Sequence, residues 1–272
     1  MPTAWHTHYL RIAGDSPLVI SLPHGGTQLP VDIARQMTPA ALAVADTDWH
    51  VGPLYAFARP LGASWLEARL SRYVVDLNRP PDDGALYPGQ VSTGLCPSHT
   101  FAGEPLYAGP VPEAAEIAAR RERYWAPYHA ALGELVAQAQ ARHGHAILFD
   151  AHSINSSVPR LFTGRLPDLN VGSYDGQSCD TSLATTVMQV LGAQQRFSQV
   201  LNGRFKGGYI TRAYGQPQRG VHAIQLEIAR SAYMDESGTD WDPARAAPLQ
   251  SLLRALLDAL LAWRPARPSA HG

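Results

Sequence analysis

The sequence has little of several features that would point to a specialised class of protein. Its 272 residues include only two cysteines, Cys96 and Cys179, which form no C-x-x-C pair, so we expect reduced thiols and no disulfide framework. Charged residues make up 17% of the chain and the net charge is −1, which leaves no basic excess to attract nucleic acid. No apolar run reaches the roughly 18 residues that a membrane span needs, and the opening segment lacks the basic and apolar regions of a signal peptide. These absences predict a cytoplasmic protein that acts on a small molecule, without a nucleic-acid or membrane partner.

The chain does have a large apolar fraction, arranged in alternating strands and helices. Hydrophobic residues account for 45% of the sequence, enough to bury a large core. Short apolar runs predict strands over Leu18–Leu22, Ala63–Ala68, Arg72–Leu77, His145–Phe149, Phe197–Leu201 and Val221–Ile228. Helical spacing predicts helices over Asp32–Met37, Leu54–Leu61, Glu113–Arg142, Ser182–Leu191 and Pro243–Trp263. This alternation predicts one α/β domain spanning residues 1–272, a three-layer α/β/α sandwich around a mixed, largely parallel sheet.

Three segments depart from this regular pattern. We expect residues 1–12 and 264–272 to be frayed ends of the domain. Residues 82–112 are rich in glycine, proline, serine and threonine, yet they also carry aromatic and aliphatic side chains. Long irregular segments in compact domains are usually functional loops, so we expect an ordered loop here that closes over an active site.

Polar residues follow or end three of the predicted strands. They are His24 in Pro-His-Gly-Gly, His152 in Asp-Ala-His-Ser, and Glu227 in Gln-Leu-Glu. The carboxyl ends of strands in an open α/β sheet meet at one crevice, so these side chains can converge. Two histidines and a carboxylate are typical ligands of a catalytic zinc ion, although the sequence has no H-E-x-x-H motif. The alternative is that each histidine is merely hydrogen-bonded at a turn.

The third ligand must be a carboxylate, and the sequence offers Asp46 and Asp48 in Asp-Thr-Asp-Trp. Asp150 could instead hydrogen-bond a ligand from behind or stabilise a turn. Glu227 follows an apolar run, where a solvated carboxylate is unexpected because burying it costs several kcal/mol unless it has a partner. Beside a metal-bound water it could act as the general base. The alternative is a glutamate on an edge strand that faces solvent.

A second cluster of residues suits a substrate that carries carboxylates. Arg72, Asn78 and Arg79 lie close together in sequence, and arginine binds carboxylates in a bidentate way that lysine cannot. Arg212 follows two glycines that allow a ligand to approach the backbone closely. The alternative for the first cluster is a structural ion pair with Asp76 or Asp82.

These motifs, taken together and in order, resemble the N-formylglutamate amidohydrolase family. The resemblance runs from about Ser16 to Asp235. The strings that carry it are SLPHGGTQLP, DTDWHVGPLY, SRYVVDLNRPPD, LYPGQVSTGLCP, DAHSI, PRLFTG, NGRFKGGYITRAYG and GVHAIQLEIARSAYMDE.

The resemblance implies a fold similar to that of zinc carboxypeptidases and aspartoacylases. In those relatives the first metal histidine stands in H-x-x-E, an Asn-Arg pair binds substrate, a second histidine follows a central strand, and a late glutamate is the base. Matching motif by motif, these roles fall to His24, to Asn78 with Arg79, to His152 and to Glu227. The chain departs from the pattern of those relatives at Thr27, where they have glutamate. We therefore expect Asp48 to be the third metal ligand.

The resemblance also implies an activity, the hydrolysis of N-formyl-L-glutamate to formate and L-glutamate in histidine breakdown. Zn²⁺ is the expected cofactor, although other divalent transition metals suit the same ligands. Glu227 and Arg79 are the expected catalytic residues, and Arg72, Asn78, Arg79 and Arg212 the expected substrate-binding residues. Two alternatives are a deacylase of another N-acyl amino acid or carboxypeptidase-like peptidase, and a dicarboxylate-binding module without catalysis.

Overall fold

A computed structural model of the chain describes residues 3–5, 7–84 and 93–265. Its strands are β1 (Thr3–Trp5), β2 (Tyr9–Ile12), β3 (Leu18–Leu22), β4 (Ser64–Ala68), β5 (Ala146–Ile154), β6 (Leu169–Gly172), β7 (Gln199–Leu201) and β8 (Val221–Ala229). Its α-helices are α1 (Val31–Ala34), α2 (Pro39–Leu42), α3 (Val51–Tyr55), α4 (Ala114–Arg120), α5 (Ala126–His143), α6 (Thr181–Gly192), α7 (Tyr209–Tyr214) and α8 (Pro243–Ala262). Shorter helical turns are η1 (Ala56–Leu61), η2 (Arg121–Trp125), η3 (Pro217–Arg219) and η4 (Arg230–Ala232).

The strands form one sheet in the order β1-β2-β4-β3-β5-β8-β6-β7. Strands β4, β3, β5 and β8 pair in parallel at its centre, whereas β2 and β6 join it in antiparallel fashion. The predicted mixed, largely parallel sheet is therefore confirmed. The prediction that residues 1–12 are frayed was wrong for residues 3–5 and 9–12, because β1 pairs with β2 and β2 pairs with β4, where Tyr9 and Leu10 are buried. Residues 266–272 of the predicted frayed end lie outside the described residues.

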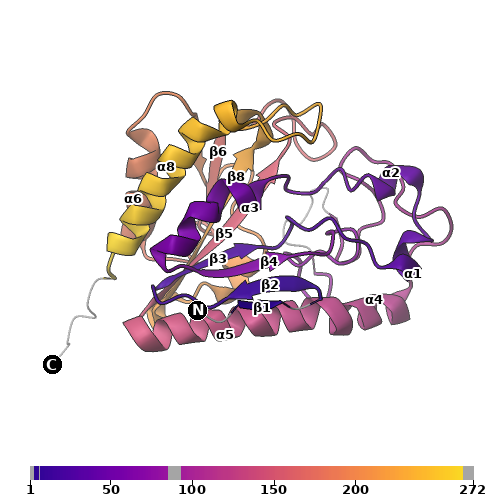
Figure 1. The fold of residues 1–272 in the computed structure, drawn as a ribbon, viewed down its shortest axis with the longest axis horizontal. Helices are drawn as coiled ribbons and strands as arrows, with labels where there is room; N and C mark the ends of the chain where they lie inside the picture. The colour runs from indigo at the N-terminus through magenta and orange to yellow at the C-terminus, as the bar shows by residue number, and fades with distance from the viewer. Residues whose placement is uncertain (1–2, 6, 85–92, 266–272) are drawn as a thin grey trace.

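Helices cover both faces of the sheet, which confirms the predicted three layers. Figure 1 shows α5 along one face and α3, α6 and α8 over the other. Alternate residues of each central strand point to opposite faces. Thus Ile20 and Phe149 pack with α6 and α8, whereas Val19 and Leu148 pack in the core beside α5. The relation to zinc carboxypeptidases stays a prediction.

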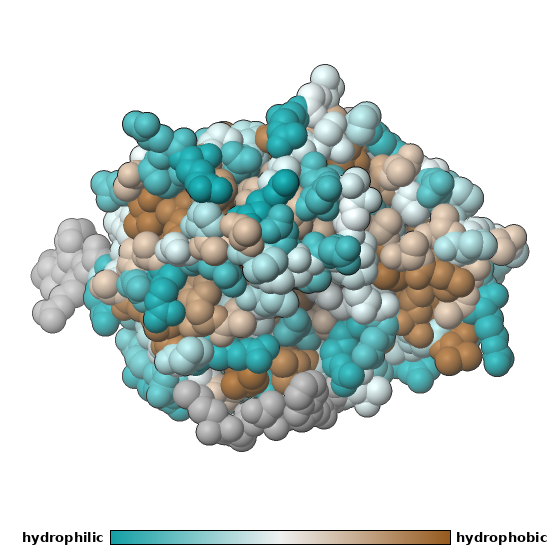
Figure 2. Space-filling view, turned by 45° about the horizontal axis from the view of Figure 1, so that its top comes forward, coloured by the Kyte–Doolittle hydropathy of each residue, from teal (hydrophilic) through white to brown (hydrophobic). Residues whose placement is uncertain are grey.

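The surface carries hydrophilic side chains interspersed with hydrophobic ones on the face drawn in Figure 2. Large hydrophobic residues that are exposed, among those described, are Val31, Leu42, Val111 and Leu201. None of the described helices is both long and apolar enough to cross a lipid bilayer.

Two sequence predictions of secondary structure were wrong in ways that matter for the site. The run Arg72–Leu77 is buried but forms turns instead of a strand, because its backbone bonds to the loop, as in Asp76 N–H to Leu95 O at 2.7 Å. Strands β5 and β8 extend five residues and one residue beyond their predicted ends, so His152 lies within a strand. The described part of residues 82–112 contains no helix or named strand, as expected of a loop.

The long helix predicted over Glu113–Arg142 is confirmed as α4, η2 and α5 in succession. The π-helical turn η2 comes just before Pro127, whose missing N–H and bulky ring prevent a regular α-helical turn. On α5, the buried His129 ring places Nε2 2.9 Å from the Leu77 carbonyl oxygen and Nδ1 3.0 Å from the Tyr214 hydroxyl. His129 thus ties the helix to the turn that leads into Asn78.

We expect His129 to make the stability of the fold depend on pH. Burial lowers the pKa of His129 to about 4, against 6.5 for an ordinary histidine. The unfolded chain therefore binds more protons between these values, so the free energy of unfolding falls as pH drops from about 6.5 to 4, by up to about 1.4 kcal/mol per pH unit from this group. Denaturant unfolding measured across this pH range should show that the free energy of unfolding depends less steeply on pH in His129→Gln than in the wild type. An unchanged dependence would remove His129 as its source, and the exposed His99→Gln serves as the matched control.

Candidate active site

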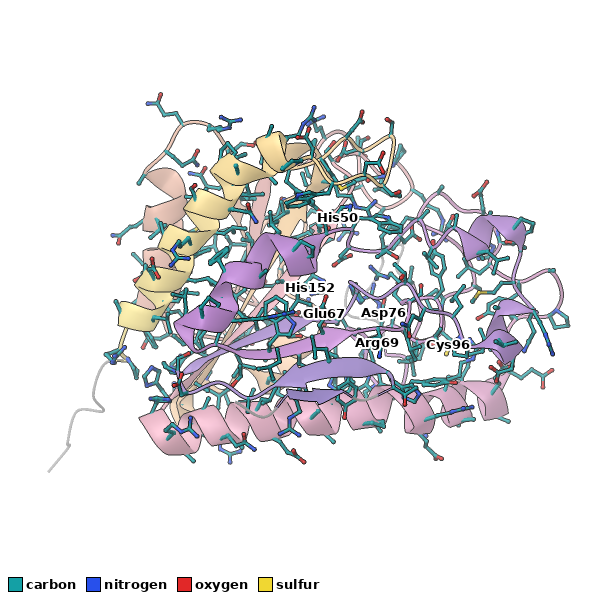
Figure 3. The ribbon with its side chains drawn as sticks, in the orientation of Figure 1. His50, Glu67, Arg69, Asp76, Cys96 and His152 are labelled. Carbon is teal, nitrogen blue, oxygen red and sulfur yellow. The ribbon has the colours of Figure 1, made fainter. Side chains whose placement is uncertain are left out.

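His24, Asp48 and His152 form a buried group whose geometry could hold a metal ion. Each offers one ligand atom, and the three atoms lie within 4.8 Å of one another. The Nδ1 atoms of His24 and His152 lie 3.8 and 3.1 Å from Asp48 Oδ2. His24 follows β3, and His152 lies on the neighbouring strand β5 (Figure 3), so adjacent parallel strands bring the two imidazoles together.

A carboxylate lies behind each of the two histidines. Asp76 Oδ1 is 2.7 Å from His24 Nε2, and Asp150 Oδ2 is 2.9 Å from His152 Nε2. Such carboxylates fix the tautomer and orientation of a metal-binding histidine, because an Nε2–H that donates to oxygen leaves Nδ1 with its lone pair. Of the two roles left open for Asp150, the structure has the hydrogen bond to His152.

The charges of this group strongly perturb its titration. Burial lowers the pKa of the His24 imidazole, and the nearby Arg72 cation lowers it further. Burial also opposes the charged form of His152, but the Asp150 and Asp48 carboxylates outweigh it and hold the pKa well above its usual value. Likewise, Arg72 and His24 overcome the effect of burial and keep the pKa of Asp76 well below its ordinary range.

Asp48 and Asp46 face different parts of the molecule, although only Thr47 separates them. Asp46 Oδ2 accepts a hydrogen bond from Phe101 N at 2.7 Å, so this carboxylate holds the loop. Asp48 turns toward the histidines, and its backbone N–H donates to His24 O at 3.0 Å. Of the two aspartates, Asp48 is therefore the one within reach of both imidazoles.

Arg230 holds the turn that carries these two aspartates. It is 4% exposed, and its guanidinium donates to Ala45 O, to Asn155 Oδ1 at 3.1 Å and to Thr47 O. Since Asp48 is the next residue after Thr47, this contact helps to orient its carboxylate. Arg230 is therefore a positioning residue for the candidate metal group.

Replacing Arg230 by methionine should both destabilise the fold and weaken metal binding. Two backbone carbonyls and an amide oxygen would lose their donor in a buried place, at a cost of about 3 kcal/mol. A loosened Asp48 should lower metal affinity by about tenfold, the effect expected when support behind a ligand is lost. Denaturant unfolding and competition with a metal chelator measure the two effects. Equal metal affinity in Arg230→Met and in the exposed control Arg196→Met would contradict the positioning role.

Glu227 lies beside the candidate metal group, on β8. The register of β5 and β8 pairs His152 with Glu227, so both side chains leave the same face of the sheet. Glu227 is 8% exposed and lines the same pocket as the two histidines. Burial raises its pKa to about 8, and the Asp48 carboxylate adds to the increase. The alternative of a solvated edge-strand glutamate does not fit this central, buried position.

The pocket above this group encloses about 650 Å³, including its open mouth, and three arginines line it. Arg72 donates to Asp76 Oδ2 at 2.6 Å and lies 4.0 Å from Asp48 Oδ1. The ion pair with Asp76 that the sequence left open is thus present, and Arg72 faces the pocket as well. Arg79 donates from Nε to Thr93 O at 2.8 Å and through Nη1 to Asn78 O at 3.1 Å.

The structure places Asn78 at the pocket wall and Arg212 outside the described pocket lining. Asn78 reaches the pocket wall, but its amide donates to Asp150 Oδ2 at 3.1 Å and accepts from Ile210 N at 2.7 Å. Arg212 is not among the described residues that line the pocket. Its Nε donates to Gly207 O at 2.8 Å, and its guanidinium stacks over Tyr174. Its role in substrate binding stays a prediction.

Sequence reasoning missed two residues of this region. Asp76 was considered from the sequence only as an ion-pair partner for an arginine, because no spacing in the sequence links Asp76 to His24. The third arginine of the pocket is Arg204, which lies in an irregular segment between β7 and α7. The neighbouring glycines Gly203, Gly207 and Gly208 were the signal that this segment approaches something closely.

Known proteins share this chain's sequence and fold. A sequence model described as N-formylglutamate amidohydrolase matches residues 16–234. The N-formylglutamate deformylases of Pseudomonas aeruginosa and Pseudomonas putida are 50% and 47% identical to the chain, each over 92% of it and 94% of the relative. The crystal structure of N-formylglutamate amidohydrolase from Ralstonia eutropha JMP134 matches with a TM-score of 0.81 at 27% identity, covering 94% of this chain and 97% of that one. These matches confirm the resemblance seen in the sequence, and the chain belongs to the N-formylglutamate amidohydrolase family.

Proposed function

We propose that this protein is a metal-dependent amidohydrolase that converts N-formyl-L-glutamate and water to formate and L-glutamate in histidine breakdown. The observation that carries the proposal is the buried group of His24, Asp48 and His152 at the base of a pocket that three arginines line. The names of the two deformylases, about half identical over nearly the whole chain, support the substrate. A cytoplasmic location remains a prediction.

The donor set of this group fits a divalent transition metal. Catalytic zinc sites use three protein ligands of histidine and carboxylate type and keep one position open. Asp76 and Asp150 occupy the Nε2 side of the two imidazoles, which leaves Nδ1 to face Asp48. When bound, Zn²⁺ would supply Lewis acidity and make water a nucleophile near neutral pH.

Glu227 moves the proton in the proposed reaction. Its carboxylate accepts a proton from the attacking water as the water oxygen bonds to the formyl carbon. It then passes the proton to the amide nitrogen as the C–N bond breaks, which releases formate and the amino group of glutamate. A carboxyl group with a pKa of about 8 can both take up and release a proton near neutral pH.

The pocket arginines and Asn78 orient the substrate in this proposal. Arg79 donates to the carbonyl oxygen as negative charge develops on it. Arg72 provides positive charge beside the metal group, where Asp76 and Asp48 hold it in place. Asn78 keeps Asp150 and His152 in position through its amide. Thr93, which belongs to the loop predicted to close over the site, contributes to the pocket wall.

A substrate panel tests the function most simply. We expect kcat/KM of the metal-loaded enzyme to be highest for N-formyl-L-glutamate, lower for N-acetyl-L-glutamate and lowest for dipeptides that end in glutamate. A preference for the acetyl substrate would instead indicate a deacylase of another N-acyl amino acid, and a preference for dipeptides would indicate a carboxypeptidase-like peptidase. Stoichiometric metal with no turnover of any of them would favour the binding module.

A further inference from the structure

We propose that Arg204 binds the side-chain carboxylate of the substrate and so sets the preference for glutamate over neutral amino acids. This inference rests on the proposed function and adds a residue that the sequence motifs did not single out. Arg204 is half-buried and lines the same pocket as His24, His152 and Glu227.

The order of strands places Arg204 on the far side of Glu227 from His24. Strand β3 leads into His24, β5 carries His152, β8 carries Glu227, and β6 and β7 follow toward the sheet edge. Arg204 comes three residues after the end of β7. The three pocket arginines therefore enter from two sides, with Arg72 and Arg79 in the turns that follow β4 and Arg204 beyond the proposed base.

The backbone that carries Arg204 is fixed against the sheet. Gly208 N–H donates to Gln225 Oε1 at 2.7 Å, and Gln225 lies two residues before Glu227 on β8. Gly172 on β6 has no room for a Cβ atom, which would lie 2.5 Å from Gly207 N. The Arg204 head is itself held at Leu161 O, by Nε at 3.2 Å and Nη2 at 3.0 Å. Such support keeps a binding group in place before the ligand arrives.

An apolar wall runs from His152 to Arg204. Ile154 follows His152 by two residues on β5, so the two side chains share one face of the sheet. Ile154 belongs to a small buried cluster against which Leu161 and Phe205 pack, and all three line the pocket. Leu161 is the residue that holds the Arg204 head. The two methylene groups of glutamate would lie against this wall, between the reacting amide and the distal carboxylate.

The charges in the pocket favour the same assignment. The substrate has two carboxylates, and three arginines line the pocket. Arg72 already faces two carboxylates, Asp76 at 2.6 Å and Asp48 at 4.0 Å. The α-carboxylate is one carbon away from the amide nitrogen and must stay near the reacting end, where Arg79 adjoins Asn78. The side-chain carboxylate extends further, along the apolar wall to Arg204.

Kinetics on a matched pair of substrates tests the assignment. Metal-loaded wild type, Arg204→Gln and Arg204→Lys are compared on N-formyl-L-glutamate and N-formyl-L-glutamine, which are nearly the same size but carry a carboxylate and a neutral amide, respectively, at the end of the side chain. We expect Arg204→Gln to lower kcat/KM for the glutamate substrate by roughly 30-fold or more, mainly by raising KM. The value of kcat/KM for the glutamine substrate should change little. Arg204→Lys should retain part of the preference, because it keeps the charge but not the bidentate geometry.

The control is Arg165→Gln, an exposed arginine of the neighbouring loop that should leave both values unchanged. Equal losses on both substrates in Arg204→Gln would overturn the assignment, as would a selective loss in Arg212→Gln that Arg204→Gln does not show. Thermal melting of each variant identifies losses that come from misfolding, and Arg204→Lys then decides the question. If the wild type hydrolyses neither substrate, the proposed function fails, and this inference fails with it.

Discussion

Replacing Glu227 by glutamine is expected to lower kcat by about 10³-fold while KM changes little. A positioned general acid–base group contributes roughly 10²- to 10⁴-fold to a rate, and glutamine keeps the size of glutamate but cannot take up a proton. Glu227 pairs in register with His152 but lies outside the group of candidate ligands, so metal content should stay at the wild-type level. Steady-state kinetics with metal analysis of the same sample measures both quantities.

The control for this variant is Glu134→Gln, which removes an exposed carboxylate that pairs with Arg11. It should retain wild-type kcat. Full turnover in Glu227→Gln would exclude Glu227 as the base. If Glu227→Gln loses both its metal and its turnover, Glu227 would instead be a further metal ligand. Another residue would then have to transfer the proton.

Replacing His152 by alanine is expected to lower metal affinity by more than about 100-fold. Even a partner behind a ligand contributes 10- to 100-fold, and here a ligand itself is removed. The change also takes away one of two described hydrogen-bond partners of Asp150 Oδ2, leaving the Asn78 amide. Activity at limiting metal should fall in proportion and recover in part when metal is added in excess. Titration with a chromophoric chelator gives the affinity, and near-stoichiometric metal in His152→Ala would remove His152 from the ligand set.

The layered fold could be predicted from the sequence because its central strands alternate between two cores. Val19 packs in the core on one face of the sheet and Ile20 in the core on the other, and this alternation is what hydrophobic periodicity detects. The run Arg72–Leu77 misled the same reasoning. Tyr73 and Val74 are as buried as strand residues, but the chain turns there to bring Asp76 against His24. Burial alone does not distinguish a strand from a buried turn.

The candidate site was predictable in part, and for a physical reason. His24, His152 and Glu227 follow from their places on adjacent central strands, which the sheet brings to one edge. The choice between Asp46 and Asp48 depended on the path of an irregular turn, which Arg230 determines from far along the chain. Arg204 reaches the pocket through a segment anchored on β6 and β8, and such contacts leave no local pattern in the sequence.

Metal analysis of Asp48→Asn beside Asp46→Asn tests most directly the claim that the buried group binds the catalytic metal. The two variants make the same chemical change two residues apart, and only Asp48 lies within reach of both histidines. Elemental analysis after identical purification should find about one equivalent of a divalent transition metal in the wild type and in Asp46→Asn, as a single catalytic site requires. It should find little in Asp48→Asn. Full metal content in Asp48→Asn, or its loss in Asp46→Asn alone, would contradict the assignment of the metal to His24, Asp48 and His152.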